Sequence, residues 1–159
     1  MRARWPLAAL TLTVALSGVP AVAQTAMVQP CDPDLPGHAR TIAEPWEANT
    51  RTFANGAVRV AILDTIEPAA AAFHLLVLSP PHDELGERQC RIVSAGAGWT
   101  GFGALSFERL EAAYDPAQGL VLVLDMGLYN PATTLSDALA LRVTINQATG
   151  VVTGAWSPQ

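Results

Sequence analysis

The chain contains no lysine. Its nine basic residues are all arginines, spread singly from Arg2 to Arg142. The absence of lysine excludes a Schiff-base lysine, a phosphate-loop lysine and a lysine general base, because each needs an amine that can lose its proton or act as a compact point charge. The arginines form no basic cluster, so nucleic acid and anionic membrane surfaces are not expected as partners.

Charged residues of both signs are also scarce. They make up 14% of the 159 residues, whereas 50% of the residues are hydrophobic. This balance excludes an intrinsically disordered, collagen-like or coiled-coil protein. The length predicts one globular domain with a packed core.

The first residues are typical of a secretory signal peptide. Arg2 and Arg4 precede a short apolar stretch over residues 7–16, and Ala21-Val22-Ala23 supplies the small residues of a cleavage site. We expect cleavage after Ala23, which gives a periplasmic or secreted chain with no transmembrane segment. An uncleaved anchor is the alternative, but the apolar stretch is shorter than the roughly 18 residues that a spanning helix needs. Loss of Arg2 and Arg4 leaves seven arginines against fourteen acids, so the mature chain is acidic.

Cysteine is limited to Cys31 and Cys90. In an oxidising compartment two isolated cysteines predict an intramolecular disulfide. Two free thiols, or a catalytic or metal-binding pair, are the alternatives. The disulfide would tether residues 24–49, which are rich in proline and have no sustained hydrophobic period, and which we expect to form an extended arm.

Residues 50–159 are expected to form a single all-β domain. Asn55-Gly56 predicts a two-residue hairpin turn, and the dense apolar run at 73–78 predicts a strand buried on both faces. One turn pattern, an Asx residue followed four positions later by glycine, occurs at 115–119 and again at 146–150. Residues 105–114 have some helical character, but strand is favoured because they lead directly into the first of these turns.

Together these segments predict an antiparallel meander of about eight strands. It would form a β-sandwich or a small barrel, preceded by a signal peptide and an extended arm. Two apolar runs, at 75–78 and 120–124, are expected as core strands covered on both sides. An outer-membrane barrel is an alternative, for which the aromatic residues are sparse.

A glycine pattern at Gly96–Gly101 matches the G-x-G-x-x-G of dinucleotide-binding proteins, with Asp125 further along. That mechanism needs a helix whose amino terminus faces the pyrophosphate and a parallel sheet. A hairpin is expected to follow instead, so a glycine-rich loop between strands is favoured and no cofactor is expected.

Catalytic signatures are weak. The histidines His38, His74 and His82 are far apart in the sequence, and no serine lies in a G-x-S-x-G elbow. Acidic loops such as Asp83-Glu84 could contribute metal ligands, but solvated acidic loops are commoner. No catalytic, cofactor or metal residue is assigned.

The function expected from the sequence is therefore binding. The chain is interpreted as a binding or interaction module of the bacterial envelope, whose partner is an unknown envelope protein or a small apolar ligand. Trp46, His82 and Trp99 are the candidate contact residues, because each lies in an expected loop. The rival hypothesis is a small metal-dependent or hydrolytic enzyme that uses His38, His74 or His82 with loop carboxylates.

Overall fold

In the part of the chain that the structure describes, nine strands form one antiparallel sheet that curls into a half-barrel. A computed structural model describes residues 23–31 and 38–159. Along the sheet the strands follow the order β2-β3-β4-β5-β1-β9-β8-β7-β6. The strands are β1 (Gln24–Pro30), β2 (Thr50–Phe53), β3 (Val58–Asp64), β4 (Phe73–His82), β5 (Arg88–Ser94), β6 (Ala104–Asp115), β7 (Gly119–Asn130), β8 (Leu135–Ile145) and β9 (Val152–Pro158). The helical elements are α1 (Trp46–Asn49) and the 3-10 turns η1 (Ala39–Thr41), η2 (Ala54–Gly56) and η3 (Ala69–Ala71).

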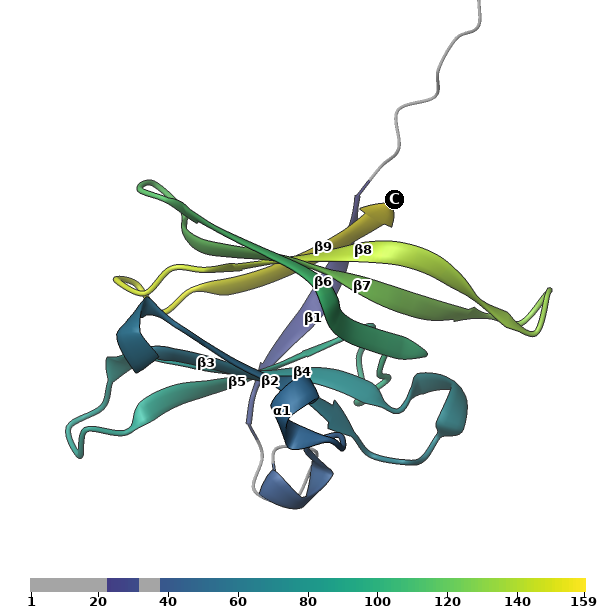
Figure 1. The fold of residues 1–159 in the computed structure, drawn as a ribbon, viewed down its shortest axis with the longest axis horizontal. Coiled ribbons are helices and arrows are strands. Elements are labelled where there is room, and N and C mark those ends of the chain that lie inside the picture. The colour runs from purple at the N-terminus through teal and green to yellow at the C-terminus, as the bar shows by residue number, and fades with distance from the viewer. Residues whose placement is uncertain (1–22, 32–37) are drawn as a thin grey trace, which may run out of the picture.

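Strand β1 joins the two halves of the sheet. Its first residues, Gln24 to Ala26, pair with β9, and its last, Met27 to Pro30, pair with β5. Figure 1 shows the result: β6 to β9 form one layer, β2 to β5 form the facing layer, and β1 passes between them. The predicted all-β meander is confirmed, as two four-stranded meanders connected through a ninth strand.

The stretch expected as an extended arm is therefore partly a component of the sheet. Its first residues form β1, at the middle of the strand order. Residues 1–22, which include most of the expected signal peptide, and residues 32–37 lie outside the described part. Within the described ranges, no helix is long and apolar enough to span a membrane.

The main core lies between the two layers. Alternation along each strand sends every second side chain inward, since successive side chains of a strand point to opposite faces. From one layer come residues such as Val60, Ile62 and Leu75, and from the other Leu122 and Leu141, all of them buried. Phe102 meets Trp156 edge to face in this core, with their ring centroids 6.2 Å apart.

A second, smaller core covers the outer face of the β2–β5 layer. Ala61, Leu63, Leu76 and Ile92 are buried there, and Trp99, Ile42 and the two cysteines pack against them. Strand β4 thus contributes Leu75 and Val77 to one core and Leu76 to the other. This confirms the prediction that the run at 73–78 is buried on both faces.

The repeated turn is formed in the same way at both places. The Asp115 carboxylate accepts hydrogen bonds from the backbone N–H groups of Ala117 and Gln118, and Asn146 Oδ1 accepts those of Ala148 and Thr149. Each turn closes at a glycine with positive φ, +104° at Gly119 and +76° at Gly150. Residues 105–114 belong to β6, so the choice of strand over helix is confirmed.

The prediction of a two-residue turn at Asn55-Gly56 is wrong. Phe53 pairs with Val58, which leaves four residues in the connection between β2 and β3. Ala54 has a positive φ in addition to Asn55 and Gly56. The left-handed stretch therefore begins one residue earlier than Asn-Gly alone indicates.

On the side opposite β1, the two layers are connected by side-chain contacts instead of by paired strands. There β2 and β6 are the two ends of the strand order. The Arg51 guanidinium lies 5.3 Å from the centroid of the Phe107 ring and donates hydrogen bonds to the carbonyls of Glu47 and Ala48 in α1. A cation–π contact and α1 thus connect the two ends.

Candidate functional site

A hollow of about 420 Å³ opens between the two layers, and its lining mixes apolar and charged groups. This volume lies within the range of small-molecule sites, which are mostly apolar with a few placed polar groups. We refer to it as the interlayer hollow. Its lining residues are Arg40, Ile42, Ala43, Glu44, Asn49, Ile62, Asp64, Ile66, Phe73 and Leu105.

The floor of the interlayer hollow comes from both layers. Ile62 of β3 and Leu105 of β6 belong to the main core, and Phe73 of β4 and Ala43 pack against it. Backbone bonds hold this region: Phe73 and Phe102 exchange hydrogen bonds of 3.0 and 2.7 Å, and Ala43 N–H donates to the Ile62 carbonyl over 2.9 Å. The floor is therefore apolar and is fixed by main chain.

The rim of the interlayer hollow carries charge of both signs. Glu44 and Asp64 contribute carboxylates and Arg40 contributes a guanidinium. Asp64 Oδ1 accepts a 2.7 Å hydrogen bond from the Ile66 N–H, which holds the β3–β4 loop against the rim. The acids outnumber the one arginine at the rim.

Ile66 is in a strained conformation at this rim. Its φ is +71°, in the left-handed region that β-branched residues rarely occupy, and its side chain is 74% exposed. Backbone strain of this kind is concentrated at ligand-binding and switch segments. Ile66 thus holds an exposed aliphatic side chain at the edge of the interlayer hollow.

The outer face of the β6–β9 layer holds a second concave region. A hollow of about 280 Å³ and one of about 440 Å³ lie next to each other there and share Glu111 and Val123 in their linings. We call this region the outer groove. Between Ser106 and Glu111 the register of β6 shifts against β7, because Ser106 pairs with Asp125 while Glu111 pairs with Val123. The extra residues bulge away from β7 and form one wall of the groove.

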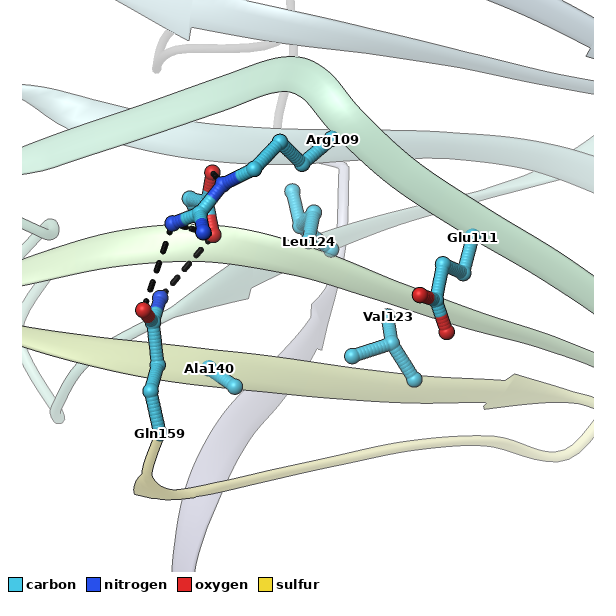
Figure 2. Close-up of a pocket in the computed structure, with 7 residues that line it drawn as sticks. Arg109, Glu111, Val123, Leu124, Ala140 and Gln159 are labelled. Atoms are coloured by element: carbon cyan, nitrogen blue, oxygen red, sulfur yellow. Dashed lines mark hydrogen bonds and ion pairs between the residues drawn. The ribbon is translucent and has the colours of Figure 1, made fainter.

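An ordered polar cluster fills one end of the outer groove (Figure 2). The Arg109 guanidinium donates to both carboxylate oxygens of Asp125, over 2.8 and 2.9 Å, and to Gln159 Oε1 over 3.2 Å. Gln159 Nε2 in turn donates to Asp125 and to the Leu139 carbonyl. Hydrogen bonding and charge from Asp125 raise the pKa of Arg109 above its ordinary value.

The candidate residues from the sequence are not brought together. Trp46 lies in α1, and Glu44 and Asn49 near it in the sequence line the interlayer hollow. Trp46 itself is not a lining residue and is 46% exposed. Trp99 packs on the second core, and His82 is exposed at the end of β4, paired with Arg88. Their role as contacts stays a prediction.

The three histidines lie in separate places. His74 is 1% exposed and shares a 2.8 Å hydrogen bond with Ser94, which is fully buried. Burial lowers the pKa of His74 to about 4, so its imidazole is neutral at neutral pH. His38 precedes η1. Across the ranges 23–31 and 38–159, no group of three or more His, Cys, Asp or Glu side chains could hold a metal ion.

The glycine pattern at 96–101 forms a loop from β5 in one layer to β6 in the other, in which Gly96 bridges Thr100. Gly101 N–H donates to the Ala71 carbonyl over 2.9 Å, and a Cβ at Gly101 would lie 2.6 Å from the Phe73 oxygen. The last glycine is therefore required by a close backbone approach. The expected glycine-rich loop is confirmed.

The disulfide predicted between Cys31 and Cys90 is present, with the two Cα atoms 5.3 Å apart. It connects the end of β1 to β5. The residues that line the two concave regions were not identified from sequence as a site; of them, only Asp125 had a role considered there, as the acid that follows the glycine pattern. The sequence signal for the groove on β6–β8 is limited to charged residues at outward positions of apolar strands, such as Asp125 in β7 and Arg142 in β8.

Comparison with known proteins gives no relative. No family model matches the chain, and neither a curated protein nor a solved structure matches it.

Proposed function

We propose that this chain is an exported, non-enzymatic binding module of the bacterial envelope that takes a small amphipathic ligand into the interlayer hollow. The observation that carries the proposal is the composition of that hollow: an apolar floor from both layers under a charged rim. The rim carboxylates of Glu44 and Asp64 outnumber Arg40, which favours a cationic head group over an anionic one.

Two features support export. The disulfide is compatible with an oxidising compartment. Strand β1 begins at Gln24, the residue after the expected cleavage point, so removal of residues 1–23 would leave every strand whole. Both features agree with a periplasmic or secreted location.

The rival hydrolytic function has less support. Among the residues described, the one hydrogen-bonded histidine–serine pair is His74 and Ser94, and both side chains are buried. A nucleophile must reach a substrate carbonyl in a cleft, and these two groups line neither concave region.

Calorimetric titration of the oxidised protein from Gln24 to Gln159 tests the proposal, with decylamine, decanol and decanoate as probes. We expect decylamine to bind most tightly and decanoate most weakly. Ala43→Trp places an indole in the interlayer hollow and should weaken decylamine binding by at least about tenfold. Ala132→Trp, in the exposed β7–β8 turn, is the control and should leave binding unchanged.

Three results would contradict the proposal: no binding of any probe, equal decylamine affinity of the Ala43→Trp and Ala132→Trp variants, or tighter binding of decanoate than of the other two probes. A melting curve of each variant confirms that the comparison is made on folded protein.

A further inference from the structure

The outer groove has a different chemistry from the interlayer hollow. Its floor is made of small and branched apolar side chains, Val121, Val123 and Ala140, and its walls carry charged groups. Leu120, Leu122 and Leu124 point to one face of β7 and are buried in the main core. On the other face Val121 is buried, but Val123 faces this groove and is only partly buried, so the expectation that strand 120–124 is covered on both sides is wrong at Val123. The reason is that β6 bulges away from β7 instead of lying flat beside it.

Strand register places an acid and a base on opposite sides of Val123. Glu111 of β6 pairs with Val123 of β7, and Val123 pairs with Arg142 of β8. Directly opposed residues of neighbouring strands point to the same face. Glu111 and Arg142 therefore stand two strand spacings apart, about 10 Å between their backbones, with Val123 between them.

The two charges are available to a ligand. Among the residues that the structure describes, the one ion pair is that of Arg109 with Asp125. Arg109 is thereby held at one end of the groove, together with Gln159. Glu111 and Arg142 are exposed and have no ion-pair partner within the described ranges.

We infer that the outer groove binds a short peptide through its two free termini, with the terminal ammonium group on Glu111, the terminal carboxylate on Arg142 and an apolar side chain over Val123. Guanidinium and carboxylate groups form strong, geometrically specific pairs. An extended chain of two or three residues spans about 7–10 Å at about 3.5 Å per residue, which is comparable with the separation of about 10 Å between the backbones of Glu111 and Arg142. The ligand is recognised by its ends, so many sequences of the right length fit.

Calorimetric titration with trialanine tests this inference, alongside N-acetylated trialanine and trialanine amide. Free trialanine should bind at least about tenfold more tightly than either capped form, because each cap removes one charge. Glu111→Gln should weaken binding of the free peptide to the level of the N-acetylated form. Arg142→Gln should weaken it to the level of the amide.

Each substitution should also remove the effect of one cap only: Glu111→Gln that of N-acetylation, and Arg142→Gln that of amidation. With Glu111→Gln, acetylation changes nothing further, while amidation still weakens binding. Glu84→Gln and Arg59→Gln are matched controls, since both side chains are exposed and belong to the β2–β5 half of the chain. They should leave all three affinities unchanged.

The inference is overturned if no heat is released at millimolar trialanine, if caps have no effect, or if the controls weaken binding as much as the groove variants. It stands apart from the proposed function, because Ala43→Trp should leave trialanine binding intact. Trialanine binding with no decylamine binding would contradict only the proposed function.

Discussion

The side-chain amide of Gln89 donates a 2.8 Å hydrogen bond to the backbone carbonyl of Gly150, 61 residues further along the chain. This bond joins β5 of one layer to the β8–β9 turn of the other. The same nitrogen lies 3.0 Å from Ser79 Oγ and 3.1 Å from the Pro80 carbonyl. The packing is close enough that a Cβ at Gly150 would lie 2.7 Å from Pro81 Cδ. A polar side chain thus connects the layers at the hairpin end of the half-barrel.

Gln89→Leu should lower the free energy of unfolding by about 1–3 kcal/mol, because the buried or partly buried acceptors of Gln89, among them the fully buried Ser79, lose their donor. Urea unfolding measures this change. Gln147→Leu, in the same β8–β9 turn, is the control and should change stability by no more than about 0.5 kcal/mol. Equal effects of the two substitutions would show that Gln89 does not connect the layers.

The Cys31–Cys90 disulfide should contribute about 4 kcal/mol, since it closes a loop of 59 residues in the unfolded chain. The Cys31→Ser/Cys90→Ser double variant should therefore unfold at a lower urea concentration than the oxidised protein. Dithiothreitol should reduce the stability of the native protein to that of the variant and leave the variant unchanged. An unchanged midpoint in the variant would contradict the role given to the bond.

Gly154 marks the seam where β1 meets β9. It pairs with Ala26, and a Cβ at Gly154 would lie 2.8 Å from the Ala26 Cβ and 3.1 Å from Val93. Gly154→Ala should therefore cost about 1–3 kcal/mol through overpacking. Gly96→Ala, whose added Cβ meets Thr100 at an ordinary 3.5 Å, should cost clearly less. Thermal melts of the two variants measure this difference. A Gly154→Ala variant as stable as the native protein would contradict the close packing of β1 against β9 at this position.

His74 makes stability depend on pH in one direction. Burial lowers its pKa from 6.5 to about 4, so between these values the unfolded chain binds a proton that the folded chain does not. The free energy of unfolding should therefore be highest above pH 6.5 and should fall as the pH drops towards 4. The loss due to His74 across this range amounts to about 3 kcal/mol. Urea unfolding across this range should show a smaller pH dependence in His74→Gln than in the native protein. Identical slopes would contradict a buried neutral imidazole.

Much of the fold could be predicted because its signals are local. Alternating side chains define the strands, and the Asx and glycine residues at 115–119 and 146–150 define two turns through their own hydrogen bonds. The pairing of Cys31 with Cys90 followed from there being no other cysteine. Each of these inferences uses residues whose partners are near in sequence or are the sole choice.

The two concave regions could not be predicted because they depend on register and on contacts between distant segments. The interlayer hollow combines Ile62 of β3 and Leu105 of β6 with Ala43, which lies in the connection between η1 and α1. The row Glu111, Val123 and Arg142 exists only in the observed pairing, since a slip of one residue would turn its side chains to the other face. The split pairing of β1 is likewise a property of the assembled sheet.

The central claim, that the interlayer hollow is the ligand site, is tested most directly by nuclear magnetic resonance of the ¹⁵N-labelled protein from Gln24 to Gln159 titrated with decylamine. The account predicts saturable shifts at the amides of Ile42, Asp64, Ile66 and Phe73, with those of Val123 and Arg142 unmoved. Shifts confined to the outer face of β6–β8, or none at any concentration short of micelle formation, would contradict it.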